Sequence, residues 1–206
     1  MGSIILASAS ARRQELLSQI GVCFSVRSQD IDESIRNAEL AADYVIRMAQ
    51  EKADSALSTL DDKKDSKDTV VLAADTSVVC DDDVLGKPID EEDAVAMLRR
   101  LSGREHRVLS AVTLATQNKQ RTVLSESRVR FRAISSEEAR QYYRSGEPVG
   151  KAGAYAIQGY AALFIEQLIG SYSGVMGLPL FETAQLLAEF SVPVLPVQST
   201  AHSIVE

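Results

Sequence analysis

The segment from Val70 to Cys80, VVLAADTSVVC, gives the clearest indication of the fold. Its first five residues are apolar and predict a buried strand, which continues through Asp75-Thr76-Ser77 into a second apolar run. A carboxylate at Asp75 is costly unless it binds a metal, a cation or several donors. A strand-end aspartate that accepts backbone hydrogen bonds is the simpler interpretation. Both interpretations stay open at this point.

Helical and extended patterns mix before this stretch. Ile4-Ile5-Leu6 predicts a short buried strand, and a helix follows from about Arg12 to a stop at Gly21. A second strand is expected over about 22–27. The longest helical pattern covers about 38–57, and the charged segment that follows it, up to Thr69, is expected to be a solvated loop.

Further helices and two long strands are expected after the central stretch. Asp90 predicts the cap of a helix that ends near Leu101. Two strands over about 107–115 and 121–134 are joined by a polar turn, which favours an antiparallel pair.

The last third of the chain combines a clear helix start with weaker extended patterns. Ser135 and Glu138 form a capping box for a helix that stops at Gly146. Two strand-like segments surround Gly159, and a last helix covers about 180–190. We therefore predict an α/β (mixed α+β) fold with an elongated mixed sheet flanked by helices. Residues 1–195 are expected to form one domain, and 196–206 a flexible tail.

Composition restricts the class of protein. The 206 residues carry a net charge of -7, which argues against a surface that holds duplex nucleic acid. An anionic small molecule could bind only through a local basic cluster, a metal ion or both. Two cysteines outside any CxxC pair indicate a reducing compartment. No apolar run is long enough to span a membrane, so we expect a cytoplasmic protein without a membrane partner.

A small polar turn at Ser8-Ala9-Ser10-Ala11-Arg12-Arg13 is the first candidate for chemistry. Free backbone N–H groups at a helix start attract anions, and two arginines there oppose the helix dipole. A bound anion would compensate those arginines. An exposed basic turn with Ser10 as an ordinary N-cap explains the pattern equally well.

Lys52 is the second candidate, because helical periodicity places it in the middle of an apolar face that includes Val45, Met48 and Ala49. Either its ammonium extends past the helix end to solvent, or it meets a carboxylate or phosphate from elsewhere. Glu33 is a candidate second carboxylate beside Asp75, although acidic loops are usually only solvated.

Several other charged residues give weaker signals. Lys87 lies at the rigid Gly-Lys-Pro turn and could direct an ammonium inward. We interpret the acidic run 81–83 as surface, because three consecutive acids in a turn point in different directions. His106 and His202 are isolated, so neither a histidine metal site nor a histidine-based triad is indicated.

Six motifs in order resemble the Maf family over about residues 3–190. They are the Ser-x-Ser-x-Arg-Arg turn and the later Glu-Lys-Ala, Ala-Asp-Thr, Gly-Lys-Pro, Leu-Ser-Gly and Lys-Ala-Gly-Ala-Tyr-Ala-Ile-Gln-Gly segments at 8–13, 51–53, 74–76, 86–88, 101–103 and 151–159; Gly-Leu-Pro follows at 177–179. Ala9 and Ala11 depart from the family's frequent glycine and usual proline, which puts the geometry of that turn in doubt more than the activity.

The resemblance implies a fold like that of inosine triphosphate pyrophosphatases, with two lobes around a cleft. It implies hydrolysis of a nucleoside triphosphate between the α- and β-phosphates with Mg²⁺ or Mn²⁺. The Ala-Gly-Ala-Tyr-x-Ile-Gln-Gly form of the 152–159 segment is similar to the branch of the family that acts on dTTP and UTP. A modified nucleotide such as 7-methyl-GTP, or a non-catalytic nucleotide-binding role in cell division, are the alternatives, and a homodimer is left open.

The resemblance also implies residue roles. Asp75 and Glu33 would hold the divalent ion, and Asp75 would take a proton from the attacking water. Thr76 and Gln158 match positions tied to substrate choice, and a glutamine suits the O4/N3–H edge of uracil or thymine. The groups expected to bind the triphosphate are Ser8, Arg12, Arg13, Lys52 and Lys87.

Overall fold

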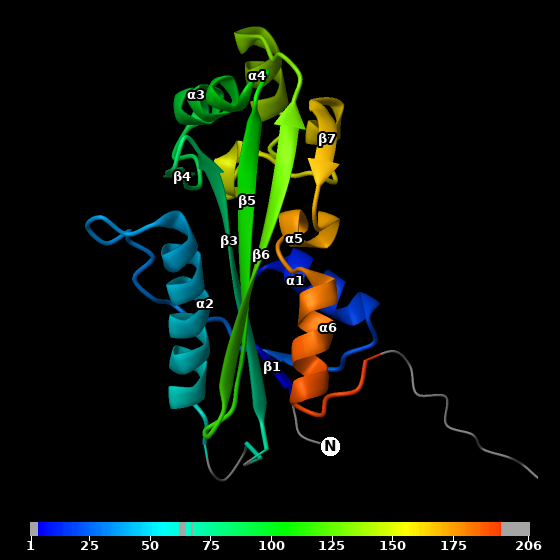
Figure 1. Cartoon of the computed structure of the whole chain (residues 1–206). Helices are drawn as coiled ribbons and strands as arrows, with labels where there is room; N and C mark the ends of the chain where they lie inside the picture. Colours follow the sequence, from blue (N-terminus) through cyan, green and yellow to red (C-terminus); the bar gives the residue numbers. More distant parts are fainter. Residues whose placement is uncertain (1–3, 62–64, 67, 195–206) are drawn as a thin grey trace, which may run out of the picture.

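A computed structural model describes residues 4–61, 65–66 and 68–194 (Figure 1). Three long strands run side by side through the length of the molecule, with helices packed along both faces. The predicted α/β class with an elongated mixed sheet flanked by helices is confirmed. The tail predicted at 196–206 and His202 lie outside the described residues, as do four residues of the predicted charged loop, at 62–64 and 67.

The strands of the described residues form one seven-stranded sheet in the order β2-β1-β3-β5-β6-β7, with β4 paired to β3. β1 is parallel to β2 and β3, and the remaining pairs are antiparallel. The two long predicted strands are confirmed as an antiparallel hairpin. The bounds are β1 Ile4–Leu6, β2 Ser25–Val26, β3 Val70–Cys80, β4 Asp83–Leu85, β5 Glu105–Ala115, β6 Gln120–Phe131 and β7 Ile165–Ile169.

The helices begin where the sequence supplies caps. The Asp90 side chain accepts from the backbone N–H of Asp93, and the predicted capping box of Ser135 and Glu138 is present. The bounds are α1 Ala11–Gln19, α2 Ala41–Ser58, α3 Glu91–Leu101, α4 Ser136–Tyr143, α5 Tyr172–Met176 and α6 Leu180–Glu189, with 3₁₀ turns η1 Ala152–Ala154 and η2 Tyr160–Leu163. None of the helices in the described part of the chain is both long and apolar enough to cross a membrane.

Alternation along β3 divides the lower half of the molecule into two faces. Val70, Leu72 and Ala74 pack against α1 and α6, whereas Val71 and Ala73 pack against α2. In Figure 1, α2 lies on one side of the long strands, and α1 and α6 lie on the other. Successive side chains of β3 therefore reach different helices, which determines what Asp75 and Thr76 can contact.

A second apolar core fills the upper part of the molecule. Leu98 of α3, Phe131 of β6 and Tyr142 of α4 belong to it. α3 and α4 form an upper lobe with β4 and β7, while α1, α2, α6, β1 and β2 form a lower lobe (Figure 1). Because β3, β5 and β6 pass through both lobes, we infer that the two lobes form one domain.

Three sequence-based expectations were wrong. The strand expected over 22–27 is only the two residues of β2, and the strand expected to end at 134 ends at Phe131. The segment before Gly159 is a 3₁₀ turn rather than a strand. Gly153 has φ +65°, and an added Cβ would lie 2.8 Å from Val78, so the chain turns tightly against β3 there. The segment after Gly159 becomes extended only in β7.

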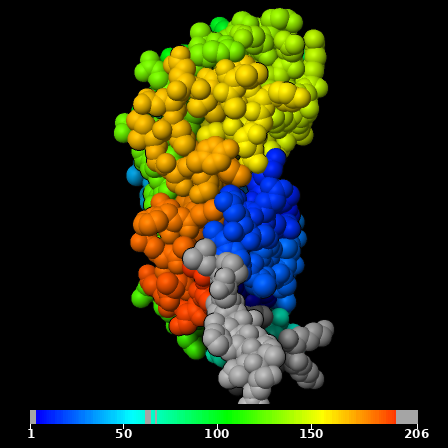
Figure 2. Space-filling model, turned by 90° about the vertical axis from the view of Figure 1, so that its right-hand side faces the viewer, coloured from blue at the N-terminus to red at the C-terminus, as the bar shows by residue number. Residues whose placement is uncertain are grey.

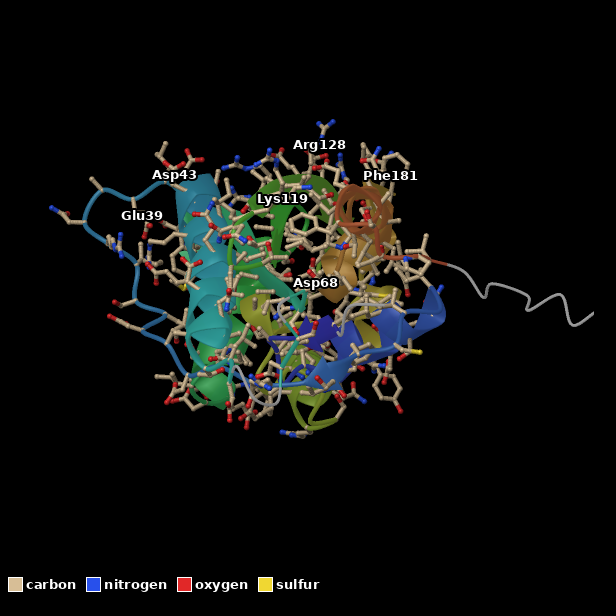
Figure 3. All side chains as sticks on the ribbon, turned by 90° about the horizontal axis from the view of Figure 1, so that it is seen from below. Glu39, Asp43, Asp68, Lys119, Arg128 and Phe181 are labelled. Atoms are coloured by element: carbon tan, nitrogen blue, oxygen red, sulfur yellow. The ribbon has the colours of Figure 1, made fainter. Side chains whose placement is uncertain are left out.

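The acidic turn between β3 and β4 is on the surface, as expected. Asp81 and Asp82 have positive φ, and Asp82 pairs with Arg107 at 2.8 Å. At the opposite end of the molecule, Lys119 lies at the tip of the β5–β6 hairpin (Figure 3). Its Nζ donates to the carbonyl of Glu189 at 2.6 Å, which ties the hairpin tip to the end of α6.

Candidate active site

A cleft of about 990 Å³ lies between the lobes. In Figure 2, N-terminal segments, in blue, lie below residues around 150–160, in yellow, and residues from both sets line the cleft. All predicted site residues line it, although they come from six separate segments: Ser8, Arg12, Arg13, Glu33, Lys52, Asp75, Thr76, Lys87 and Gln158.

Lys52 lines the cleft and contacts two carboxylates. Its Nζ lies 2.7 Å from Oδ1 of Asp75 and 2.7 Å from Oε1 of Glu33. Only 10% of the Lys52 side chain and 13% of the Asp75 side chain are exposed. Of the two interpretations of Lys52, the one in which the ammonium meets a carboxylate from elsewhere is therefore confirmed. Asp75 likewise binds a cation rather than simply ending a strand.

The backbone explains this encounter. Asp75 follows Val71 and Ala73 on the face of β3 that packs against α2, and Lys52 lies on the apolar face of α2. The strand and the helix therefore direct one buried acid and one buried base toward each other. Each charge lowers the cost of burying the other.

Glu33 reaches this pair from the loop between β2 and α2. Tyr44 of α2 donates its hydroxyl to the backbone carbonyl of Glu33 at 2.9 Å, which holds the loop against the helix. Lys87 Nζ lies 3.3 Å from Oε2 of Glu33. Burial raises the pKa of Glu33, but the contacts with Lys52 and Lys87 outweigh it and leave the pKa below the ordinary value. We call Glu33, Lys52, Asp75 and Lys87 the Lys52 cluster.

Thr76 points to the other face of β3, where it meets Arg13 of α1. Arg13 donates Nε to the carbonyl of Gly177 at 2.9 Å, Nη1 to Oγ of Ser8 at 3.2 Å and Nη2 to Oγ1 of Thr76 at 3.4 Å. Burial lowers the pKa of Arg13, and the nearby carboxylates Asp75 and Glu33 act in the opposite direction. Arg13 thus joins three segments of the chain through neutral acceptors.

Arg12 points to the upper lobe instead. With the amide oxygen of Gln158 turned toward it, Arg12 donates Nη1 at 2.7 Å and Nε at 3.3 Å to that oxygen. Arg12 also pairs with Glu15 at 2.7 Å, and 43% of its side chain is exposed. The two adjacent arginines therefore differ, since Arg13 is held within the lower lobe whereas Arg12 links the two lobes across the cleft.

Three residues near the site had not been singled out from the sequence. Burial, with Asp75 and Glu33 nearby, raises the pKa of Tyr44 to about 12, so its hydroxyl stays protonated and donates to the Glu33 loop. Its spacing from Met48 and Lys52 would have revealed that it shares their helix face. Ser110 of β5 lies 3.1 Å from Thr76 Oγ1, and no sequence signal indicated it.

Tyr155 is the third of these residues, and it contacts His106. His106 is only 2% exposed, and its Nε2 lies 2.9 Å from the Tyr155 hydroxyl. Within the described residues, its Nδ1 has no hydrogen-bond partner. Burial lowers the pKa of His106 to about 4, so the ring is neutral at pH 7. The contact between the His106 ring and Tyr155 therefore supports the upper wall of the cleft, which Tyr155 lines.

The chain is similar to known proteins over nearly its whole length. The Maf-like protein family matches residues 3–190. A dTTP/UTP pyrophosphatase of Hahella chejuensis is 51% identical over 191 residues, which cover 93% of this chain and 94% of that protein. Proteins of the same name from Methylobacillus flagellatus and Cupriavidus metallidurans are 50% and 52% identical, over 94% and 92% of this chain and 96% and 98% of their own lengths. The chain therefore belongs to the Maf family.

Proposed function

We propose that this chain hydrolyses dTTP and UTP to the nucleoside monophosphate and pyrophosphate, with Mg²⁺ or Mn²⁺ as cofactor. The observation that carries the proposal is the Lys52 cluster, which places two carboxylates and two ammonium groups together in the cleft. Relatives at about 50% identity that carry the name dTTP/UTP pyrophosphatase support the choice of substrate.

The residues present fit a divalent cation. Asp75 and Glu33 offer hard oxygen ligands, and they already share one cation, the Lys52 ammonium. The described residues contain no group of three or more histidine, cysteine or acidic side chains that could hold a metal ion. Magnesium commonly uses one or two carboxylates and completes its shell with water and substrate phosphates, so a two-carboxylate site suits it.

The roles follow from charge and position. When bound, a divalent ion would neutralise phosphate charge and make a water molecule more acidic. Asp75, fixed on the rigid strand β3, would accept the proton of the attacking water. Arg12, Lys52 and Lys87 would bind the phosphate oxygens and stabilise the charge that develops on the leaving pyrophosphate.

Base recognition would fall to the upper lobe. Gln158 lies on the cleft wall, and its amide oxygen accepts from Arg12. Its amide N–H groups are then the ones oriented to donate, which suits a carbonyl of uracil or thymine. Thr76, which accepts a hydrogen bond from Arg13 and also lines the cleft, would contribute to substrate choice as well.

The test is pyrophosphate release from a panel of UTP, dTTP, CTP, ATP, GTP and 7-methyl-GTP, each with Mg²⁺, with Mn²⁺ and with a chelator. We expect the highest kcat/KM for UTP and dTTP and no release with the chelator. A higher kcat/KM for 7-methyl-GTP than for UTP and dTTP would favour the alternative substrate, a modified nucleotide. Nucleotide binding without turnover of any member would contradict the enzymatic proposal.

We also propose a cytoplasmic location, where nucleoside triphosphates are available. The two cysteines support it, because Cys23 and Cys80 are both free thiols. Fractionation of cells that express the full chain checks this, and recovery outside the cytoplasmic fraction would contradict it.

A further inference from the structure

The contact of one ammonium group with two carboxylates raises a question about metal binding. Lys52 Nζ lies between Oε1 of Glu33 and Oδ1 of Asp75, at 2.7 Å from each. A divalent cation held by these two oxygens would need the space that the Lys52 ammonium fills. A metal ion and an ammonium group beside the same two oxygens repel each other strongly where little water screens them. The Lys52 and Asp75 side chains are only 10% and 13% exposed. Lys52 and a metal ion therefore compete for one position.

The charges of the cluster favour the ammonium before nucleotide binds. Two carboxylates face two ammonium groups, so the Lys52 cluster as a whole is neutral. A divalent cation alone would give the cluster an excess of positive charge. The Arg13 guanidinium, which interacts electrostatically with Asp75 and Glu33, adds to this excess. The magnesium complex of a nucleoside triphosphate still carries net negative charge, so it can bind beside these cations without such an excess.

We propose that Lys52 acts as a built-in cation that keeps divalent metal out of the site until nucleotide binds. With the metal–nucleotide complex present, Glu33 and Asp75 would hold the metal, and the Lys52 ammonium would move to a phosphate oxygen. The four-carbon stem of a lysine allows such a movement, whereas the shorter side chain of Asp75 stays on its strand. This inference rests on the proposed function for the identity of the metal and the nucleotide.

The consequence is that metal and nucleotide bind cooperatively. Nucleotide draws the Lys52 ammonium away from the carboxylates and so raises the affinity for the metal. By linkage, the metal must raise the affinity for nucleotide by the same factor. Removal of the Lys52 ammonium should instead open the carboxylate pair to metal alone. Lys87 should not have this effect, because 62% of its side chain is exposed and it contacts only one of the two carboxylates, at 3.3 Å.

The experiment measures Mn²⁺ binding directly, by electron paramagnetic resonance of free Mn²⁺, on the full chain without nucleotide. We expect Lys52→Met to bind Mn²⁺ roughly 5- to 150-fold more tightly than wild type. Lys52→Gln, which keeps a donor and is close to lysine in length, should show the same direction if the methionine variant folds poorly. Lys87→Met is the matched control and should change the affinity by less than about 3-fold, as expected for an exposed pair.

Two further variants locate the effect. Adding Asp75→Asn to Lys52→Met should abolish the gain, whereas Asp75→Asn alone should leave nucleotide-free Mn²⁺ binding of the wild type unchanged. An equal gain in Lys52→Met and Lys87→Met would reduce the effect to net charge and overturn the inference. Tight, nucleotide-free Mn²⁺ binding by wild type that Asp75→Asn abolishes would also overturn it, without any lysine variant.

The non-hydrolysable analogue α,β-methylene-UTP separates this inference from the proposed function. It should raise the Mn²⁺ affinity of wild type by roughly 5- to 150-fold. If the wild type turned over UTP but Lys52→Met bound Mn²⁺ no more tightly than the wild type, this inference would be contradicted and the proposed function would stand. If the wild type turned over no nucleotide and also bound no Mn²⁺ in the presence of the analogue, the proposed function would be contradicted as well.

Discussion

The Lys52 cluster and the segment 152–158 face each other across the cleft, and they are held in place by different forces. In the cluster, charged side chains from β3, α2 and two loops bond to one another. The facing segment is uncharged from Ala152 to Gln158 and irregular. It is held by a glycine packed on Val78 and by the Tyr155 contact with buried His106. Charge organises one wall, and packing organises the other.

This difference suggests a division of labour. Phosphate groups and the metal are common to all nucleoside triphosphates, and the groups that would bind them lie largely on regular elements. The base differs between substrates, and the wall proposed to contact it is a turn that small sequence changes can reshape. Substitutions in the cluster should therefore affect all nucleotides equally, and substitutions in segment 152–158 should affect them unequally.

Asp75→Asn should have the largest effect. The shape of the side chain is nearly retained, but the charge needed for the metal and for proton transfer is lost. We expect kcat to fall by roughly 10²- to 10⁴-fold for every nucleotide, while the chain still folds. Steady-state kinetics and circular dichroism check both parts.

Asp82→Asn is the matched control for this variant, because Asp82 lies in the surface turn that follows β3 and its side chain is 93% exposed. It should leave kcat unchanged. Near-normal turnover in Asp75→Asn would remove Asp75 from the chemistry.

The packed wall predicts a pH effect on stability. His106 has a pKa of about 4 in the folded chain, against about 6.5 when unfolded. Below pH 6.5 the unfolded chain binds a proton that the folded chain does not, so stability falls until the pH reaches about 4. This loss amounts to at most about 3 kcal/mol.

Urea unfolding of wild type and His106→Phe at pH 7 and pH 4.5 isolates this contribution, because other groups titrate equally in both proteins. The variant should lose about 2–3 kcal/mol less than wild type between the two pH values. Identical losses would mean that His106 gains a proton while the protein stays folded.

Gln158→Ala is expected to have a smaller and selective effect. The Lys52 cluster is untouched, so kcat/KM for UTP and dTTP should fall more than for CTP or purine nucleotides, by roughly 1–3 kcal/mol, or about 5- to 150-fold. Kinetics across the nucleotide panel measure the ratio. An equal fall for all nucleotides would show that Gln158 acts through its contact with Arg12 on the phosphates, and would break the division between the walls.

Much of the framework was predictable from local pattern. The strand at 70–80 and the helix at 41–58 follow from apolar periodicity, and the same patterns singled out Asp75 and Lys52 as charges in apolar surroundings. Their meeting was not predictable from spacing alone, because they lie 23 residues apart and Glu33 comes from a loop. The alternation of β3 side chains would nevertheless have assigned Asp75 and Thr76 to opposite faces.

The irregular upper wall was beyond such patterns. The two segments around Gly159 were predicted as strand-like, yet Glu147 accepts from the backbone N–H groups of Tyr160 and Ala161 and from the hydroxyl of Tyr142. This side chain stabilises a turn whose own residues carry no turn signal besides glycine. The Arg12–Gln158 contact depends on how this turn meets α1, so it too follows only from tertiary structure.

The cleft should bind the nucleotide for hydrolysis of the bond between its α- and β-phosphates, with help from a divalent cation. Product analysis of UTP turnover in ¹⁸O-labelled water by mass spectrometry, with Mg²⁺ and with a chelator, tests this. We predict equal amounts of UMP and pyrophosphate, with the label in UMP because pyrophosphate is the leaving group, and no products with the chelator. Formation of UDP and phosphate, or undiminished turnover with the chelator, would contradict the account.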